Sequence, residues 1–112
     1  MTAESLKLVR MKRAVNALMT DINTKIFPVE RIILFGSIVD GVFNEHSDLD
    51  LCVVAESDLS DQEKRDIENA IRHILQDELE IDIVYCNRDK LQNGQHVFKS
   101  IQENGRILYE KQ

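Results

Sequence analysis

Two aspartates separated by a single residue are the part of this sequence best suited to chemistry. Asp48 and Asp50 begin an apolar run that continues through Leu51 to Val54. In a β-strand, residues i and i+2 face the same side, about 6–7 Å apart. Two carboxylates held in this way repel each other by roughly 2 kcal/mol at an effective dielectric constant near 20. A divalent cation removes that repulsion, and clustered oxygen ligands suit Mg²⁺, so the pair predicts a magnesium site.

A third carboxylate, Asp82, lies inside another strand-like run, from Glu80 to Cys86. Strand alternation places Asp82 on the same face as Val84 and Cys86. Taken by itself, Asp82 fits equally well a paired aspartate or one on an exposed strand edge. Together with Asp48 and Asp50, it is a candidate third metal ligand, because three converging carboxylates are unfavourable without a cation.

A glycine–serine pair, Gly36-Ser37, directly follows the apolar run from Arg31 to Phe35. A glycine there lets the backbone turn sharply or approach a ligand, and the serine offers a hydroxyl and an N–H. If a short helix begins at Ser37, its unpaired N–H groups favour a phosphate; a plain turn is the alternative. Ser47, just before the aspartates, is expected to cap or orient them, and simple solvation in the loop is equally compatible with its position.

The elements that must position these residues follow from hydrophobic periodicity. An α/β fold is predicted, with a small mixed sheet of three to four strands and helices packed on it. Ser60 and Glu63 form a capping box for a central helix, and Gly105 is expected to cap a later one in which Val97, Phe98 and Ile101 face inward. The expected helices cover residues 5–23, 61–78 and 95–103, and the expected strands cover 31–35, 48–54, 80–86 and 106–109.

Composition limits the class of protein. The 112 residues suffice for one domain, 1–112, and for a single core. A net charge of −6 disfavours a protein that binds nucleic acid directly through its phosphates. The sequence has no apolar run of membrane-spanning length and no signal peptide, so we expect no membrane association and a cytoplasmic location. Cys52 and Cys86 lie in apolar runs and are expected to be reduced core thiols rather than a disulfide.

Gly36-Ser37, ten further residues, Asp48-Leu49-Asp50 and then a strand aspartate, Asp82, form a pattern. This pattern resembles the minimal nucleotidyltransferases (MNT) of the DNA polymerase β-like nucleotidyltransferase superfamily, over nearly the whole chain. The resemblance implies the polymerase β-like fold, with the strands that carry Asp50 and Asp82 as neighbours. It also implies ATP as substrate and two Mg²⁺ ions held by Asp48, Asp50 and Asp82. Asp82 would bind the nucleophile-side ion and could accept the proton, while Gly36, Ser37 and Ser47 would contact the nucleotide.

Minimal members of this family are often antitoxins paired with a helical HEPN ribonuclease toxin. By resemblance, the chain would transfer AMP from ATP to a tyrosine of that partner, as part of a hetero-oligomer or homodimer. Two alternatives remain: an antitoxin that neutralises its partner by binding alone, and a nucleotidyltransferase acting on a small molecule such as an aminoglycoside. One departure bears on activity, since the family frequently has an arginine just before the glycine that corresponds to Gly41, and this chain has Asp40.

Overall fold

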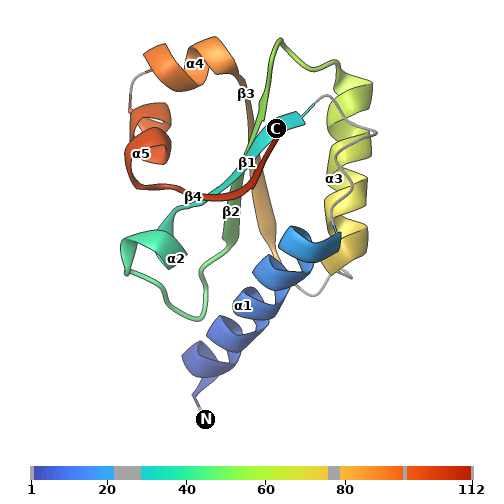
Figure 1. Ribbon diagram of the computed structural model, residues 1–112. Helices are drawn as coiled ribbons and strands as arrows, with labels where there is room; N and C mark the ends of the chain where they lie inside the picture. The colour runs from blue at the N-terminus through green and yellow to red at the C-terminus, as the bar shows by residue number, and fades with distance from the viewer. Residues whose placement is uncertain (1, 22–28, 76–78, 95, 112) are drawn as a thin grey trace.

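A computed structural model describes residues 2–21, 29–75, 79–94 and 96–111 (Figure 1). Helices and strands alternate along most of the chain, as expected for an α/β fold. In order, the elements are α1 (Ala3–Asp21), β1 (Val29–Phe35), α2 (Ser37–Asp40), β2 (Leu49–Ala55), α3 (Asp61–Leu75), β3 (Ile81–Asn87), α4 (Arg88–Asn93), α5 (Val97–Asn104) and β4 (Arg106–Glu110).

The four strands form one mixed sheet in the order β3-β2-β1-β4. β1 pairs antiparallel with β2 and with β4, whereas β2 and β3 are parallel. A parallel pair needs a crossover connection, and α3 provides it between β2 and β3. The predicted mixed α/β sheet is therefore confirmed, and the strands carrying Asp50 and Asp82 are neighbours as the family resemblance implied.

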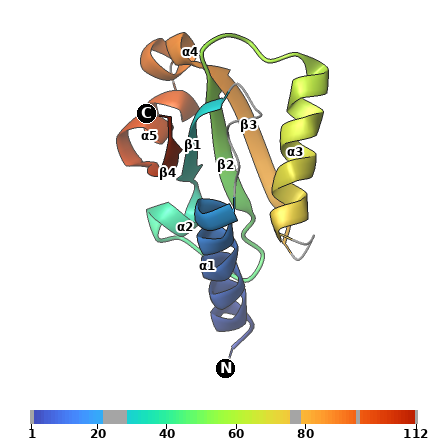
Figure 2. The ribbon, with the colours of Figure 1, turned by 45° about the vertical axis from the view of Figure 1, so that its right-hand side comes forward.

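Helices cover both faces of the sheet (Figures 1 and 2). Helices α1 and α3 lie on one side, and α4 and α5 lie on the other. Alternation along β2 sends Leu51 and Val53 to the α1/α3 side and Cys52 and Val54 to the α4/α5 side. All four are essentially inaccessible to solvent, and a buried side chain of this size stabilises the fold by about 1.5–3 kcal/mol.

Local signals explain where the longest elements begin. The capping box before α3 is present: the Glu63 N–H donates to the Ser60 hydroxyl at 3.1 Å, and the Ser60 N–H donates to the Glu63 carboxylate at 2.9 Å. Met11, Val15 and Leu18 form the buried stripe of α1. The expected ends of these two helices, at residues 22–23 and 76–78, lie outside the described residues.

Two features of the second half differ from expectation, helix α4 and the position of Val97. Helix α4 was not predicted; Asn87 caps it, accepting the Lys90 N–H at 2.7 Å, but six residues are too few to show helical periodicity. In α5, Ile101 is buried and Phe98 packs on the same cluster. Val97 was expected to face inward and is instead 45% exposed.

Candidate functional site

The site begins where β1 ends and the backbone turns into α2. Gly36 has φ +84° and ψ −154°, a region that only glycine adopts readily. Its carbonyl accepts the N–H groups of Val39 at 3.0 Å and Asp40 at 2.9 Å. Of the two alternatives at Ser37, the structure has the short helix rather than a plain turn; the helix is four residues long, and Gly41 ends it in the left-handed conformation.

The carboxyl group of Asp50 lies directly against Gly36. A Cβ on Gly36 would overlap the Asp50 Oδ2 atom and would lie 2.9 Å from its Cγ and 3.2 Å from its Cβ. The two residues come together because Phe35, just before the glycine, pairs in register with Asp50 across β1 and β2. Two motifs that are separate in the sequence therefore form one site, and a side chain at position 36 would occupy the place of the carboxylate.

Asp82 is the partner of Asp50 on the neighbouring strand. The parallel pairing of β2 and β3 sets these two residues directly opposite each other, and residues in register on adjacent strands face the same side of the sheet. Asp48 lies one residue before β2 and is exposed, whereas Asp50 is half-buried and Asp82 is exposed. The structure thus brings the three predicted carboxylates to the same end of the sheet, with Asp50 against Gly36.

The electrostatics of Asp50 reflect this grouping. Burial raises the pKa of Asp50, and the negative charges of Asp82 and Asp48 raise it further. Each of these contributions acts against the ionised form. A cation placed among the three carboxylates would cancel their mutual repulsion and favour the ionised form of Asp50. Clustered negative charge of this kind is expected of a metal site before the ion binds.

The donor set suits a hard divalent cation, since it consists of carboxylate oxygens with serine and backbone groups nearby. Within the described ranges, however, no three His, Cys, Asp or Glu side chains are arranged closely enough to hold a metal ion as they stand. The assignment of Asp48, Asp50 and Asp82 as metal ligands, and of Gly36, Ser37 and Ser47 as nucleotide contacts, remains a prediction.

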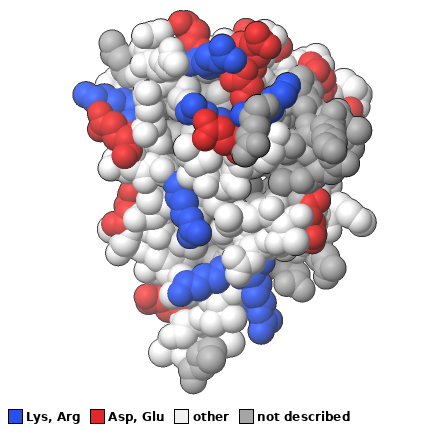
Figure 3. All heavy atoms as spheres, in the orientation of Figure 1, with Lys and Arg blue, Asp and Glu red and all other residues white. Residues whose placement is uncertain are grey.

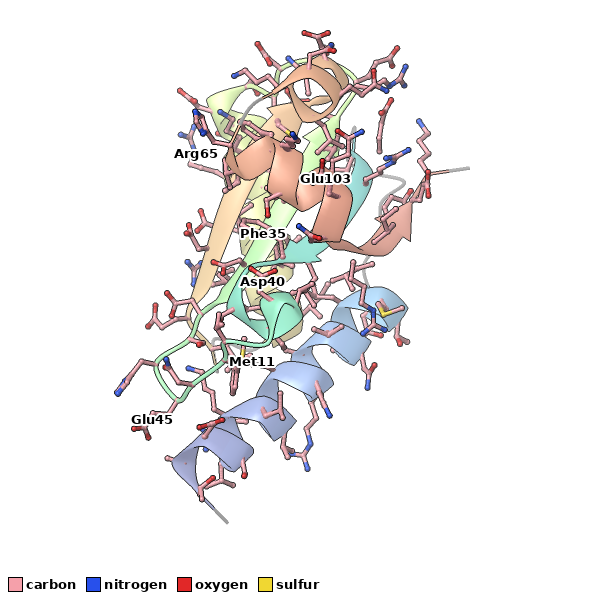
Figure 4. All side chains as sticks on the ribbon, turned by 90° about the vertical axis from the view of Figure 1, so that its left-hand side faces the viewer. Met11, Phe35, Asp40, Glu45, Arg65 and Glu103 are labelled. Carbon is pink, nitrogen blue, oxygen red and sulfur yellow. The ribbon has the colours of Figure 1, made fainter. Side chains whose placement is uncertain are left out.

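The loop between α2 and β2 is closed by its own hydrogen bonds. The Ser47 hydroxyl accepts the Asn44 N–H at 2.9 Å, and the Asn44 side-chain oxygen accepts the His46 N–H at 2.8 Å. In Figure 4 the part of the loop that carries Glu45 reaches away from the sheet, while Phe35 and Asp40 lie closer to the sheet. Sequence analysis did not single out Asn44; the available signal was an asparagine three residues before a serine, a spacing typical of side-chain-closed turns.

A separate groove of about 500 Å³ lies between α1, α2 and β4. Its floor includes Leu34 and Val15, which belong to the core on the α1/α3 side, so the groove lies across the sheet from Asp50. Lys12 and Arg106 line it, and Figure 3 shows basic side chains over this part of the surface. The groove does not include the three aspartates, and we do not assign it to the reaction.

Two thiols lie behind the acidic residues on the same face of the sheet. Cys52 and Cys86 are buried and form no disulfide with each other, with 3.5 Å between their sulfur atoms. The hydrogen bond with Cys86 and burial both raise the pKa of the Cys52 thiol. Both cysteines are free and buried in the core, in agreement with their interpretation as reduced core thiols.

Comparison with known proteins agrees with the fold and with the motif. The family model for the polymerase beta nucleotidyltransferases matches residues 18–112. The chain belongs to this family. The matched region contains the Gly36-Ser37 turn and all three aspartates, so these residues belong to a nucleotidyltransferase domain. A search of curated proteins finds no match.

Solved structures of toxin–antitoxin complexes share the fold. A chain of a toxin–antitoxin complex with AMP-PNP superimposes with a TM-score of 0.53 at 22% identity, covering 90% of this chain and 73% of that chain. Chains from two mutants of a complex named MntA–HpeT give TM-scores of 0.53 and 0.52 at 20% and 22% identity, and again 73% of each is covered. At these identities the likeness establishes the fold, which for this nucleotidyltransferase domain is polymerase β-like.

Proposed function

We propose that this nucleotidyltransferase is a metal-dependent antitoxin that transfers AMP from ATP to a tyrosine hydroxyl of a HEPN-type toxin partner. The observation that carries the catalytic part is the in-register pairing of Asp50 with Asp82 beside Gly36. The partner is inferred from the resemblance to the minimal nucleotidyltransferases. The structural likeness to toxin–antitoxin complexes, one of them containing AMP-PNP, supports it.

The chemistry assigned to the site is an in-line displacement. The tyrosine oxygen attacks the α-phosphorus of ATP, the bond from that phosphorus to the α–β bridging oxygen breaks, and pyrophosphate leaves with the electron pair. Mg²⁺, when bound, would stabilise the charge on the attacking and leaving oxygens. Asp82 would accept the hydroxyl proton.

The binding roles follow from where the residues lie. Gly36 leaves room for the Asp50 carboxyl and exposes backbone without a side chain. Ser37, at the first position of α2, offers its hydroxyl and N–H to the β- and γ-phosphates. Asp48 and Asp50 would share the metal ions between them.

Among the described helices none is long and apolar enough to cross a bilayer, and a cytoplasmic location fits an ATP-using partner of an intracellular toxin.

A transfer assay tests this proposal directly. The chain is incubated with its candidate partner, the product of the adjacent gene, in the presence of Mg²⁺ and ATP labelled at the α-phosphate. We expect label on the partner, and loss of label with Asp50→Ala. Asp66→Ala is the matched control, because Asp66 is an exposed carboxylate on α3, on the opposite side of the sheet. An unlabelled partner at saturating ATP and Mg²⁺ would refute the proposal.

A second candidate is neutralisation by binding alone. The observation in its favour is Asp40, an exposed acid on α2 where the family frequently has an arginine. A negative charge there disfavours a bound triphosphate. This candidate predicts that the double variant Asp48→Ala/Asp50→Ala still neutralises the toxin in cells, whereas the catalytic proposal predicts loss of neutralisation.

A further inference from the structure

Asp48 differs from the other two carboxylates because no strand pairing holds it. Asp50 and Asp82 are fixed opposite each other by β2 and β3, whereas Asp48 precedes β2 and is exposed. A metal ligand must be held close to its working geometry if it is to bind with full affinity. The question is therefore which groups determine the position of Asp48.

The residue after Asp48 is anchored firmly. The Leu49 N–H donates to the Glu80 carbonyl at 3.0 Å, which ties the start of β2 to the residue before β3. Leu49 itself is fully buried in the core on the α1/α3 side. The backbone on the C-terminal side of Asp48 is thus fixed relative to Asp82.

The residues before Asp48 form a turn closed by three hydrogen bonds. The Ser47 N–H donates to the Asn44 carbonyl at 3.1 Å, which closes a four-residue turn. The Asn44 N–H donates to the Ser47 hydroxyl oxygen at 2.9 Å, and the His46 N–H donates to the Asn44 side-chain oxygen at 2.8 Å. Asn44 and Ser47 therefore each use backbone and side chain to hold the turn, which we call the Asn44–Ser47 clamp.

We infer that Asn44 and Ser47 are positioning residues for the metal site, acting through Asp48. Asp48 is the single residue between the clamp and the anchored Leu49, so fixing both neighbours restricts where its carboxylate can lie. Ser47 accepts in the clamp, which leaves its hydroxyl proton available to donate elsewhere. This inference rests on the proposed function, since it assumes that Asp48 binds a metal ion.

The prediction concerns metal affinity rather than chemistry. Losing a group that orients a metal ligand typically weakens metal binding by about 10–100-fold. We expect Ser47→Ala and Asn44→Ala each to weaken Mn²⁺ binding by about tenfold. Ser47→Thr keeps the hydroxyl and Asn44→Asp keeps the acceptor oxygen, so both should restore most of the affinity.

The experiment titrates Mn²⁺ into the full chain without nucleotide, by calorimetry and by electron paramagnetic resonance of free Mn²⁺. Omitting ATP removes any direct contact between Ser47 and phosphate from the measurement. Ser57→Ala is the matched control, because Ser57 lies in the loop after β2, at the opposite end of that strand. Melting curves establish that each variant is folded at the titration temperature; a purely structural role would lower the melting temperature and leave the Mn²⁺ affinity of the folded chain unchanged.

The outcomes separate this inference from the proposed function. A wild-type chain that binds no Mn²⁺ overturns both. A wild-type chain that binds Mn²⁺ while Ser47→Ala and Asn44→Ala bind it equally well overturns the clamp alone. Tenfold weaker binding in both alanine variants, restored in Ser47→Thr and unchanged in Ser57→Ala, supports it.

Discussion

Replacing Gly36 with alanine is the substitution that probes the site most selectively. Its backbone has φ +84°, and an added Cβ would overlap the Asp50 carboxyl. Gly41 provides the matched control within the same short segment, because it has φ +80° but nothing within 4 Å of an added Cβ. Both substitutions strain the backbone, and only the one at position 36 displaces Asp50.

The expected losses in the free energy of unfolding follow from backbone strain and from steric overlap. Alanine at Gly41 adopts the left-handed helical region, at a cost of about 1–2 kcal/mol. Alanine at Gly36 adopts a region that is nearly exclusive to glycine, at about 1–3 kcal/mol. Forcing a methyl group into occupied space adds about 1–3 kcal/mol more. We therefore expect Gly36→Ala to cost about 2–6 kcal/mol and Gly41→Ala about 1–2 kcal/mol.

A double-mutant cycle in urea isolates the contact itself. Asp50→Ala removes the carboxyl group that the new methyl group would meet, so Gly36→Ala should cost about 1–3 kcal/mol less in that background. Gly41→Ala should cost the same in both backgrounds. Strictly additive effects of Gly36→Ala and Asp50→Ala would refute the conclusion that the Asp50 carboxyl lies against the glycine.

Three further predictions concern stability. Asp50→Asn should raise the free energy of unfolding in metal-free buffer at pH 7 by about 1 kcal/mol, because it relieves like charges on neighbouring strands. Since the folded-state pKa of Asp50 is raised, this gain should vanish as the pH falls below the ordinary pKa of 3.8. A gain in unfolding free energy that persists below that pH would contradict the prediction. Ser60→Ala removes the cap of α3 and should cost about 0.5–2 kcal/mol in urea unfolding, with Ser57→Ala neutral. Burial raises the pKa of Tyr85 to about 12, so thermal stability should fall as the pH rises above 10, and Tyr85→Phe should reduce that loss.

The sequence predicted those parts of the site that depend on local chemistry. Gly36-Ser37 after an apolar run indicated a sharp turn with a short helix as one possible continuation, and the structure has the turn and the helix. Ser60 and Glu63 marked the start of α3 through a pairing that needs only four consecutive residues. Such features can be predicted from the sequence because the interacting groups are close together in the chain.

The parts of the site that depend on the register of strand pairing could not be predicted from the sequence. Asp82 is opposite Asp50 only because β2 and β3 pair in parallel without offset, and a shift of one residue would turn Asp82 to the other face. The sequence grouped Asp82 with Asp48 and Asp50, and the family resemblance implied neighbouring strands, but neither predicted the register that sets Asp82 opposite Asp50. The Asn44–Ser47 clamp escaped notice for a related reason, since loop asparagines are common and only their hydrogen bonds distinguish them.

The central claim is that Asp48, Asp50 and Asp82 hold divalent metal together. The most direct measurement is a crystal structure grown with Mn²⁺ and a non-hydrolysable ATP analogue, with data collected at the manganese absorption edge. We expect anomalous density between the three carboxylates, with the triphosphate of the analogue over Gly36 and Ser37. Manganese bound elsewhere, or Asp82 turned away from the ion, would contradict it.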